Sequence, residues 1–261
     1  MASRVKLGPG AVAFFTRRLR RAGSAARAKG EKAYLKSDLR FWGTGQDSIR
    51  ASVREFSEAH PDLTRAQLRA IAETLYATDV HELRAAAIGV LERDSETLDD
   101  RDSPWLIALV RKSESWAYVD WIAPKVIGDI IARDPRARRR LAVWSRDTNF
   151  WVRRAALLAE HDALRAGGGD FGLWSRLAAS MLDEREFFIR KAIGWVLREV
   201  SKKRPELTYA FLRKHRDRVS RLSLLEGAKY LPAPKRRTLG LPDEAAWVKR
   251  EASRKVAPGR R

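Results

Sequence analysis

The sequence has no cysteine and only four histidines among its 261 residues. Without cysteine there is no disulfide, thiolate nucleophile or cysteine-ligated zinc or iron–sulfur cluster, which excludes a secreted mini-domain held together by disulfides. No apolar run approaches the roughly 20 residues of a membrane-spanning helix, and the apolar patch near the N-terminus covers only Ala11 to Phe15. We expect no membrane contact and a cytoplasmic location, associated with the nucleoid if the chain is bacterial.

Motifs for metals and nucleotide phosphates are also missing. The glycine run 167–169 is not followed by the Lys-Ser/Thr pair of a phosphate-binding loop, so we interpret it as a linker. The histidines have no His or carboxylate partners at the spacing of metal ligands; they are His60, His81, His161 and His215. We therefore expect neither a metal nor a cofactor.

Acidic residues are the other scarce group. The chain has 33 Asp and Glu against 53 Lys and Arg, a formal net charge of +20. Residues 1–40 carry eleven bases and two acids, and residues 232–261 carry nine and three, which leaves the middle at only +5. This charge favours a polyanionic partner such as DNA, although two solvated basic ends on a nearly balanced domain are the simpler interpretation.

Helix signals run through the whole sequence, and nothing indicates a β-hairpin. The apolar stretch 121–131 contains Pro124, which should kink or break its helix. Residues 183–202 form the longest uninterrupted helical pattern. Helix starts are predicted at Ser24 (running towards Ser37), Thr64 (to Ala77), Asp79 (to Asp94), Ser103 with Pro104 in the first position, and Thr148.

A short pattern recurs at intervals of 30 to 37 residues. In its clearest form an apolar residue is followed by an arginine and then alanines, and the copies start at Leu83, Val119, Val152, Ile189 and Val219. Such a period resembles a degenerate HEAT-type repeat of two short helices. We therefore predict an all-α, HEAT-like helical-repeat solenoid with a concave DNA-binding face. The alternative is that alanine- and arginine-rich helices look alike by composition alone.

The segment 184–200 predicts a helix with a narrow apolar stripe. On the face opposite that stripe stand Lys191, Trp195 and Arg198, with the tryptophan between the two cations. Two interpretations remain open. The face packs against the next repeat, or the indole meets a sugar or base of DNA while Lys191 and Arg198 bind flanking phosphates. The apolar stripe consists of Ile189, Ile193, Val196, Leu197 and Val200.

Two further pairs join an aromatic ring to a charge on one helix face. Trp116 and Asp120 are four residues apart, and Trp151 and Arg154 are three apart. Asp120 stands where Arg84, Arg153 and Arg190 stand in the other copies of the repeat. An isolated acid on a helix is usually just solvated, but a basic surface around Asp120 would hold it ionised.

The segment 186–199, EFFIRKAIGWVLRE, resembles the AlkD-like DNA alkylation repair family of HEAT-like DNA glycosylases. Further similarity follows the same order along the chain, at Tyr34 to Gly43, Ser115 to Ile130 and Asn149 to Ala156. The resemblance covers roughly residues 10–231. We therefore expect one repeat domain over residues 1–231 and a basic C-terminal tail over 232–261.

The resemblance also implies a set of site residues. Asp120 would be the catalytic carboxylate, with Trp116 and Trp195 beside it. Tyr34, Arg154 and Arg198 would contact DNA, and Lys191 and Trp151 join them from the helix patterns above. Departures from the family occur at residues 117–118, at Trp121 and at the glycine linker, and they bear on lesion preference more than on reaction class.

By this resemblance the chain excises cationic N3- or N7-alkylated purines from duplex DNA as a monofunctional, monomeric glycosylase, without flipping the base. A cationic purine is already a good leaving group, so one carboxylate suffices to stabilise the oxocarbenium-like sugar and orient water. The main alternative is a non-catalytic protein on the same scaffold that binds DNA structures. A scaffold for acidic proteins is weaker, because it gives Asp120 and the Trp195 face no role.

Overall fold

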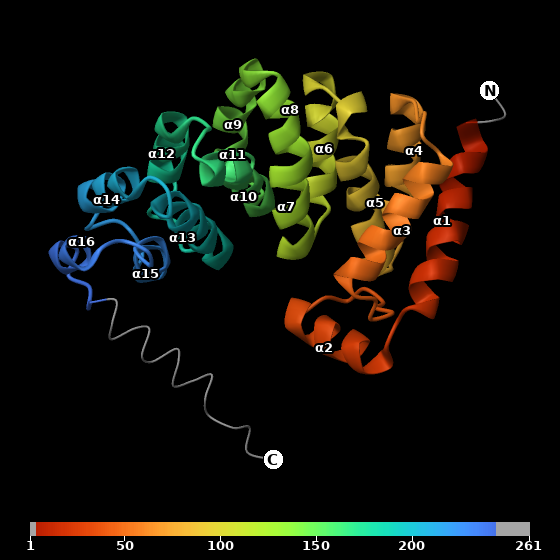
Figure 1. Ribbon diagram of the computed structural model, residues 1–261, viewed down its shortest axis with the longest axis horizontal. Helices are drawn as coiled ribbons and strands as arrows, with labels where there is room; N and C mark the ends of the chain where they lie inside the picture. Colours follow the sequence, from red (N-terminus) through yellow and green to blue (C-terminus); the bar gives the residue numbers. More distant parts are fainter. Residues whose placement is uncertain (1–3, 244–261) are drawn as a thin grey trace, which may run out of the picture. The chain divides into compact units, whose positions relative to one another are not determined.

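The computed structural model describes residues 4–243 and shows a chain of short helices with no strand in that range (Figure 1). Its one β-type contact there is an isolated parallel bridge between Arg40 and Val80. The predicted all-α class is confirmed. The chain divides into two units, residues 1–138 and 139–261, a boundary that falls inside the single repeat domain expected from the sequence.

The first unit packs its helices around a continuous apolar core. Helix α1 lies against α4, and α3 and α4 lie against α5. Their shared interior includes Phe15, Phe56 and Ile88, all at most 2% exposed. The α-helices of this unit are α1 (Arg4–Arg21), α2 (Ala25–Leu35), α3 (Gln46–Ala59), α4 (Arg65–Tyr76), α5 (His81–Arg93), α6 (Ser103–Arg111), α7 (Trp116–Ile122) and α8 (Gly128–Arg133).

The second unit has its centre in α13, which packs against the helices before and after it. The predicted apolar stripe of this helix is confirmed, since its five residues from Ile189 to Val200 are at most 1% exposed. The helices of this unit are α9 (Arg139–Trp144), α10 (Phe150–Leu158), α11 (His161–Ala166), α12 (Phe171–Ser180), α13 (Phe187–Ser201), α14 (Pro205–Lys214), α15 (Arg221–Gly227) and α16 (Ala233–Thr238).

Two of the predicted helix starts are confirmed, and a third is displaced by one residue. Ser24 accepts a hydrogen bond from the Arg27 N–H at the start of α2. Thr64 forms a capping box with Gln67, in which each side chain satisfies an N–H of the other's backbone. Helix α6 begins one residue earlier than predicted, with Asp102 at the cap and Ser103 in the first position. Pro104 is then the second helical residue, still within the first turn, where its missing N–H costs no helical hydrogen bond.

Three other helix predictions were wrong in detail. Asp79 does not cap α5, because its carboxylate pairs with Arg40 at 2.7 Å and Val80 takes the cap position. Asn149 rather than Thr148 caps α10, through its side-chain oxygen. The pattern at 183–202 forms a helix of only 15 residues, shorter than the 18 of α1, because Glu186 caps it at Phe187.

Pro124 interrupts the helix that contains it, as predicted. Helix α7 ends at Ile122, and residues 123–127 form a π-helical turn before α8. Proline has no N–H to give to the carbonyl four residues earlier, which belongs to Asp120. The widened turn begins three residues after Asp120, and single π-turns of this kind are frequent at functional sites.

Part of the expected C-terminal tail is folded onto the second unit. Helix α16 lies within it, and the Arg236 side chain is buried, donating to the carbonyl of Ala228 at 2.5 Å. The carbonyl of Leu239 accepts from Arg216 at 2.8 Å. The remainder of that expected tail, residues 244–261, lies outside the described residues.

The loop over residues 36–45 is fastened to the start of α5 by one buried carboxylate. Oε1 of Glu82 accepts the backbone N–H groups of Trp42, Gly43 and Thr44 at 2.9, 2.6 and 3.2 Å. Glu82 itself is fully buried. Because buried N–H groups are costly to leave without partners, this carboxylate determines the path of the loop.

The same loop also holds α2. The Gly43 carbonyl accepts from the Ser24 N–H, at the cap of α2, at 3.2 Å. Gly43 has φ +75°, and a Cβ there would collide with the Ser24 carbonyl, so only glycine fits without strain. Helix α2 has no buried residue of its own, and its position therefore depends on contacts of this kind.

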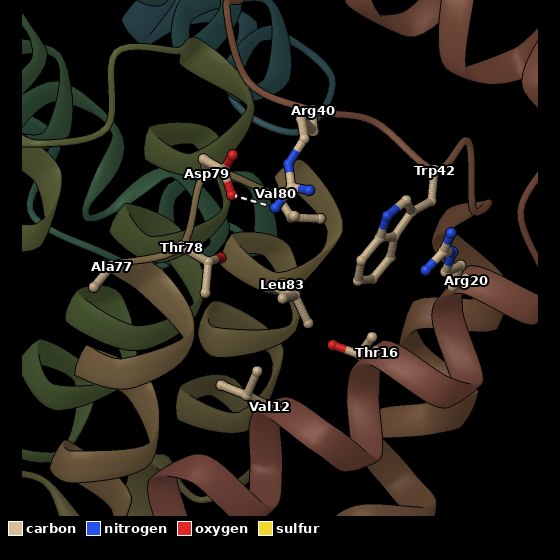
Figure 2. A pocket seen from close by; sticks show the side chains of 10 residues that line it. All are labelled: Val12, Thr16, Arg20, Arg40, Trp42, Ala77, Thr78, Asp79, Val80 and Leu83. Carbon is tan, nitrogen blue, oxygen red and sulfur yellow. Dashed lines mark hydrogen bonds and ion pairs between the residues drawn. The ribbon is translucent and has the colours of Figure 1, made fainter.

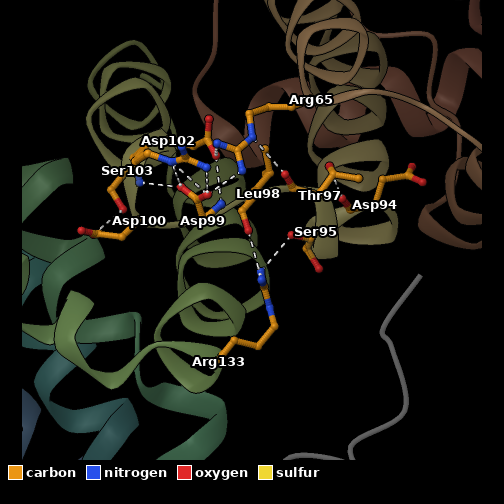
Figure 3. A network of polar contacts seen from close by, with 11 residues as sticks. Arg65, Asp94, Ser95, Thr97, Leu98, Asp99, Asp100, Asp102, Ser103 and Arg133 are labelled. Carbon is orange, nitrogen blue, oxygen red and sulfur yellow. Dashed lines mark hydrogen bonds and ion pairs between the residues drawn. The ribbon is translucent and has the colours of Figure 1, made fainter.

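A polar network fixes the turn between α5 and α6 (Figure 3). Arg65 at the start of α4 reaches Asp99 at 2.6 Å and the carbonyl of Thr97 at 3.1 Å. From α8, Arg133 donates to the carbonyls of Ser95 and Leu98 at 2.9 and 3.0 Å. Hydrogen bonds from Arg101 and Arg65 hold the pKa of Asp99 well below its usual range, so this network stays ionised near neutral pH.

Replacement of Glu82 should loosen the loop and destabilise the first unit. We expect Glu82→Ala to lower the free energy of unfolding by about 3 kcal/mol, because three backbone N–H groups lose their acceptor. Glu82→Gln keeps an acceptor oxygen and should cost clearly less. Urea denaturation of both variants measures the difference, and an alanine variant within 1 kcal/mol of wild type would contradict this account.

His81 should make stability depend on pH. Its Nδ1 lies 2.7 Å from the Tyr118 hydroxyl, its ring stacks on Phe41, and burial lowers its pKa to about 4. In the unfolded chain this histidine binds a proton near pH 6.5, whereas in the folded chain it stays neutral down to about pH 4. The free energy of unfolding therefore falls by about 3 kcal/mol as the pH drops from 6.5 to 4. Unfolding measured across this range should show a weaker pH dependence in His81→Gln; an equal slope in both proteins would refute the assignment.

Candidate functional site

Helix α7 carries the predicted Trp116 and Asp120 pair. Ser115 caps the helix by accepting from the Ala117 N–H at 3.3 Å. One helical turn then separates Trp116 from Asp120, which places both on one face. Both side chains are half-buried and line the same cavity of about 390 Å³.

Tyr34 joins this cavity from α2. Its ring meets the Trp116 ring edge to face, with centroids 5.7 Å apart and an interplanar angle of 90°. Tyr34 nevertheless remains 73% exposed, so this aromatic pair is open to a ligand. Three of the predicted site residues, Tyr34, Trp116 and Asp120, are thus brought together within the first unit.

The charges around the cavity are balanced. Glu31 and Asp120 supply two carboxylates, while Arg50 and Lys125 supply two cations. His81 also lines it, and its lowered pKa keeps it neutral at pH 7. The other lining residues are Leu35, Gln46, Ala117 and Trp121. An oxocarbenium-like sugar could therefore be stabilised here by Asp120, with aromatic rings on one side.

Sequence reasoning missed the residues that α3 brings to this cavity. Gln46 and Arg50 are one turn apart and lie off the buried stripe formed by Ile49 and Val53. A helical wheel of 46–59 would have shown them as neighbours on an exposed face. Nothing in the sequence, however, places that face beside α7.

The repeat explains why Asp120 is unusual on its helix. Arg84, Arg153 and Arg190, here called the loop-binding arginines, each donate to the carbonyl six residues earlier. Those carbonyls belong to Thr78, Asp147 and Glu184, at 2.8, 2.7 and 2.7 Å. A carboxylate cannot donate such a bond. At the position where the other copies donate a hydrogen bond to the preceding loop, Asp120 therefore has a group with no proton to donate.

In the second unit, the face of α13 opposite its core stripe is largely covered by neighbouring elements. The Trp195 ring packs against His161 of α11, with centroids 4.4 Å apart. Lys191 and Arg198 both pair with Glu226 of α15, Lys191 at 3.6 Å. Packing on the neighbouring repeat, one of the two interpretations left open, therefore accounts for these contacts. Lys191 still keeps 42% of its side chain exposed.

Trp151 and Arg154 are neighbours, as predicted, but both are buried. They meet at Phe188: the Trp151 ring lies 4.9 Å from that ring, and the Arg154 guanidinium 5.8 Å. Arg154 is 2% exposed and donates to the Phe188 carbonyl. In this position it ties α10 to the start of α13, and a direct phosphate contact would require its side chain to move.

Another cavity of the first unit has a larger volume than the one around Asp120. It measures about 600 Å³ and is bounded by α1, the loop 36–45 and the start of α5 (Figure 2). Its one carboxylate, Asp79, is taken by Arg40, and the pKa of Asp79 is lowered by that hydrogen bond. We therefore regard the smaller cavity around Asp120 as the better candidate for chemistry.

Two other kinds of feature are absent from residues 4–243. In that range no group of three or more His, Asp or Glu residues is arranged to hold a metal ion. None of the helices described there is long and apolar enough to cross a membrane.

The structure resembles three solved structures. A predicted DNA alkylation repair enzyme from Enterococcus faecalis is 24% identical, with a TM-score of 0.71, and the match covers 80% of this chain and 96% of that one. AlkD2 from Streptococcus mutans is 19% identical, with a TM-score of 0.58 and coverage of 78% and 99%. The protein smu.31 from Streptococcus mutans UA159 is 18% identical, with a TM-score of 0.54 and coverage of 71% and 98%.

These likenesses support the helical-repeat fold. No curated protein matches the sequence. The model of the DNA alkylation repair enzyme family, however, matches residues 15–231, which include the candidate site and most of both units. The chain belongs to the DNA alkylation repair enzyme family.

Proposed function

We propose that this protein is a monofunctional DNA glycosylase that hydrolyses the N-glycosidic bond of cationic N3- or N7-alkylated purines in duplex DNA. The observation that carries the proposal is the cavity in which Asp120 lies with Trp116 and Tyr34. Family membership supports a role in alkylation repair, and a carboxylate beside two aromatic rings in this cavity suits glycosidic bond cleavage.

One carboxylate is enough for the reaction because the alkylated base already carries a positive charge. The glycosidic electron pair leaves with the purine and neutralises it, so no general acid is needed. The sugar becomes cationic at C1′, and Asp120 stabilises that charge. A water oxygen then bonds to C1′, and Asp120 accepts the proton that the water loses.

The aromatic rings suit a substrate that stays stacked in the duplex. Trp116 and the exposed Tyr34 form an open edge-to-face pair, which can contact the deoxyribose and its developing charge. We therefore propose that the base is not flipped into a pocket. An open site would also accept bulky adducts.

We assign the second unit a supporting role in binding duplex DNA. Lys191 and Arg198 are still partly exposed beside Glu226, so they are the more direct candidates for phosphate contacts, with Trp195 between them. Arg154 and Trp151 are buried, and we assign them to holding this surface in shape.

The decisive experiment measures the release of free base from duplex DNA that carries N7-methylguanine or N3-methyladenine. Under single-turnover conditions, Asp120→Asn should lower the rate by a factor on the order of 100 or more, because it removes the charge opposite the sugar cation. DNA binding should stay near that of wild type.

Asp129→Asn is the matched control. Asp129 lies in the same unit and pairs with Arg133 at 3.1 Å, one turn away on α8, so the substitution removes the same charge outside the cavity and should leave base release unchanged. Full activity in Asp120→Asn would remove Asp120 from the mechanism. Tight DNA binding by wild type with no base release would instead identify a non-catalytic protein that binds DNA structures.

A further inference from the structure

Trp121 has no part in the proposed chemistry, yet its side chain is held by two specific contacts. Its Nε1 donates to Oε2 of Glu92 at 2.6 Å. The guanidinium of Arg50 lies over its ring, 4.9 Å from the centroid. Arg50 also pairs with Glu92 at 3.3 Å, so the three side chains fix one another.

This trio stands where two cavities adjoin. Arg50 and Trp121 line the cavity of Asp120 and also a second cavity of about 330 Å³. The remaining lining residues of the second cavity are Val53, Arg54, Gly89, Glu92 and Arg93. A ligand in one cavity therefore has a direct neighbour in the other.

The two cavities differ in charge. The second one is lined by three arginines against a single carboxylate, that of Glu92, which is engaged by Trp121 and Arg50. Arg54 and Arg93 are exposed. Arg93 interacts electrostatically with Asp94, whose carboxylate does not line this cavity. An excess of guanidinium groups in a recess favours an anion that presents a pair of oxygen acceptors, such as the two non-bridging oxygens of a phosphodiester.

Helix geometry brings the three arginines to the same cavity. Arg50 and Arg54 are one turn apart on α3 and share a face, and Arg93 ends α5, which packs against α3. Gly89 keeps the floor open: a Cβ there would lie 2.9 Å from Val53 and 3.5 Å from the Trp121 ring.

We infer that this second cavity, here called the arginine recess, binds a backbone phosphate of the DNA strand next to the nucleotide held at Asp120. Trp121 and Glu92 serve as positioning residues that hold Arg50 between the two cavities. The inference rests on the proposed function in taking DNA as the ligand. It adds a phosphate contact within the first unit, separate from the cations of α13.

The test measures how the affinity for an undamaged duplex depends on salt, so it requires no base release. The logarithm of the binding constant falls linearly with the logarithm of the salt concentration. Each lost phosphate contact makes this negative slope less steep by about 0.9. Arg54→Ala and Arg93→Ala should each make this dependence less steep, by up to this amount, because the two arginines share one phosphate. Arg54→Lys should retain most of the wild-type slope, because it keeps the charge.

Arg101→Ala is the matched control. It removes one arginine from the same unit, outside the recess, where Arg101 is 80% exposed and pairs with Asp99; its slope should equal that of wild type. The inference would be overturned if Arg54→Ala and Arg93→Ala had the same slope as wild type. It would also be overturned if their slopes became no less steep than that of Arg101→Ala. Because only binding is measured, reduced slopes support the arginine recess even if no base is released.

Discussion

The candidate site depends on a single buried carboxylate that is not part of it. Glu82 collects three backbone N–H groups of the loop 36–45, and that loop in turn holds the start of α2 through Gly43 and Ser24. Helix α2 has no buried residue, so hydrophobic packing does little to position it. The place of Tyr34 opposite Trp116 therefore follows from hydrogen bonds rather than from the core, and the site gains an aromatic ring that remains exposed.

Much of the fold could be predicted because it follows from local rules. The stripe on α13, the caps at Ser24 and Thr64 and the break at Pro124 are each determined by residues within one or two turns. The misplaced starts near Asp79 and Thr148 have a different origin. Arg40, 39 residues away in the sequence, binds the Asp79 carboxylate, and Asn149 takes the cap in place of its neighbour. Neither an ion pair between distant residues nor the choice between two adjacent capping residues can be predicted from the spacing of apolar residues.

The same contrast applies to the site. Trp116 and Asp120 could be paired from their spacing, and Tyr34 from resemblance to a family. Gln46, Arg50 and Lys125 were not found, because their approach to α7 depends on how α3 and the π-turn pack. For Arg154 the sequence predicted more exposure than the structure shows. It was expected to contact DNA, but its guanidinium lies against Phe188 and connects two helices.

The loop-binding arginines show how a repeat protein can separate chemistry from architecture. In three copies an arginine secures the loop before its own helix. In the copy that holds Asp120, the preceding loop is secured from outside, by the Tyr76 hydroxyl at Ser113 and by Arg84 at Glu114. The loop before Asp120 therefore does not need a hydrogen-bond donor at position 120. A carboxylate can thus occupy a repeat position that is filled elsewhere by a loop-binding arginine, because side chains of the neighbouring repeat hold the loop in its place.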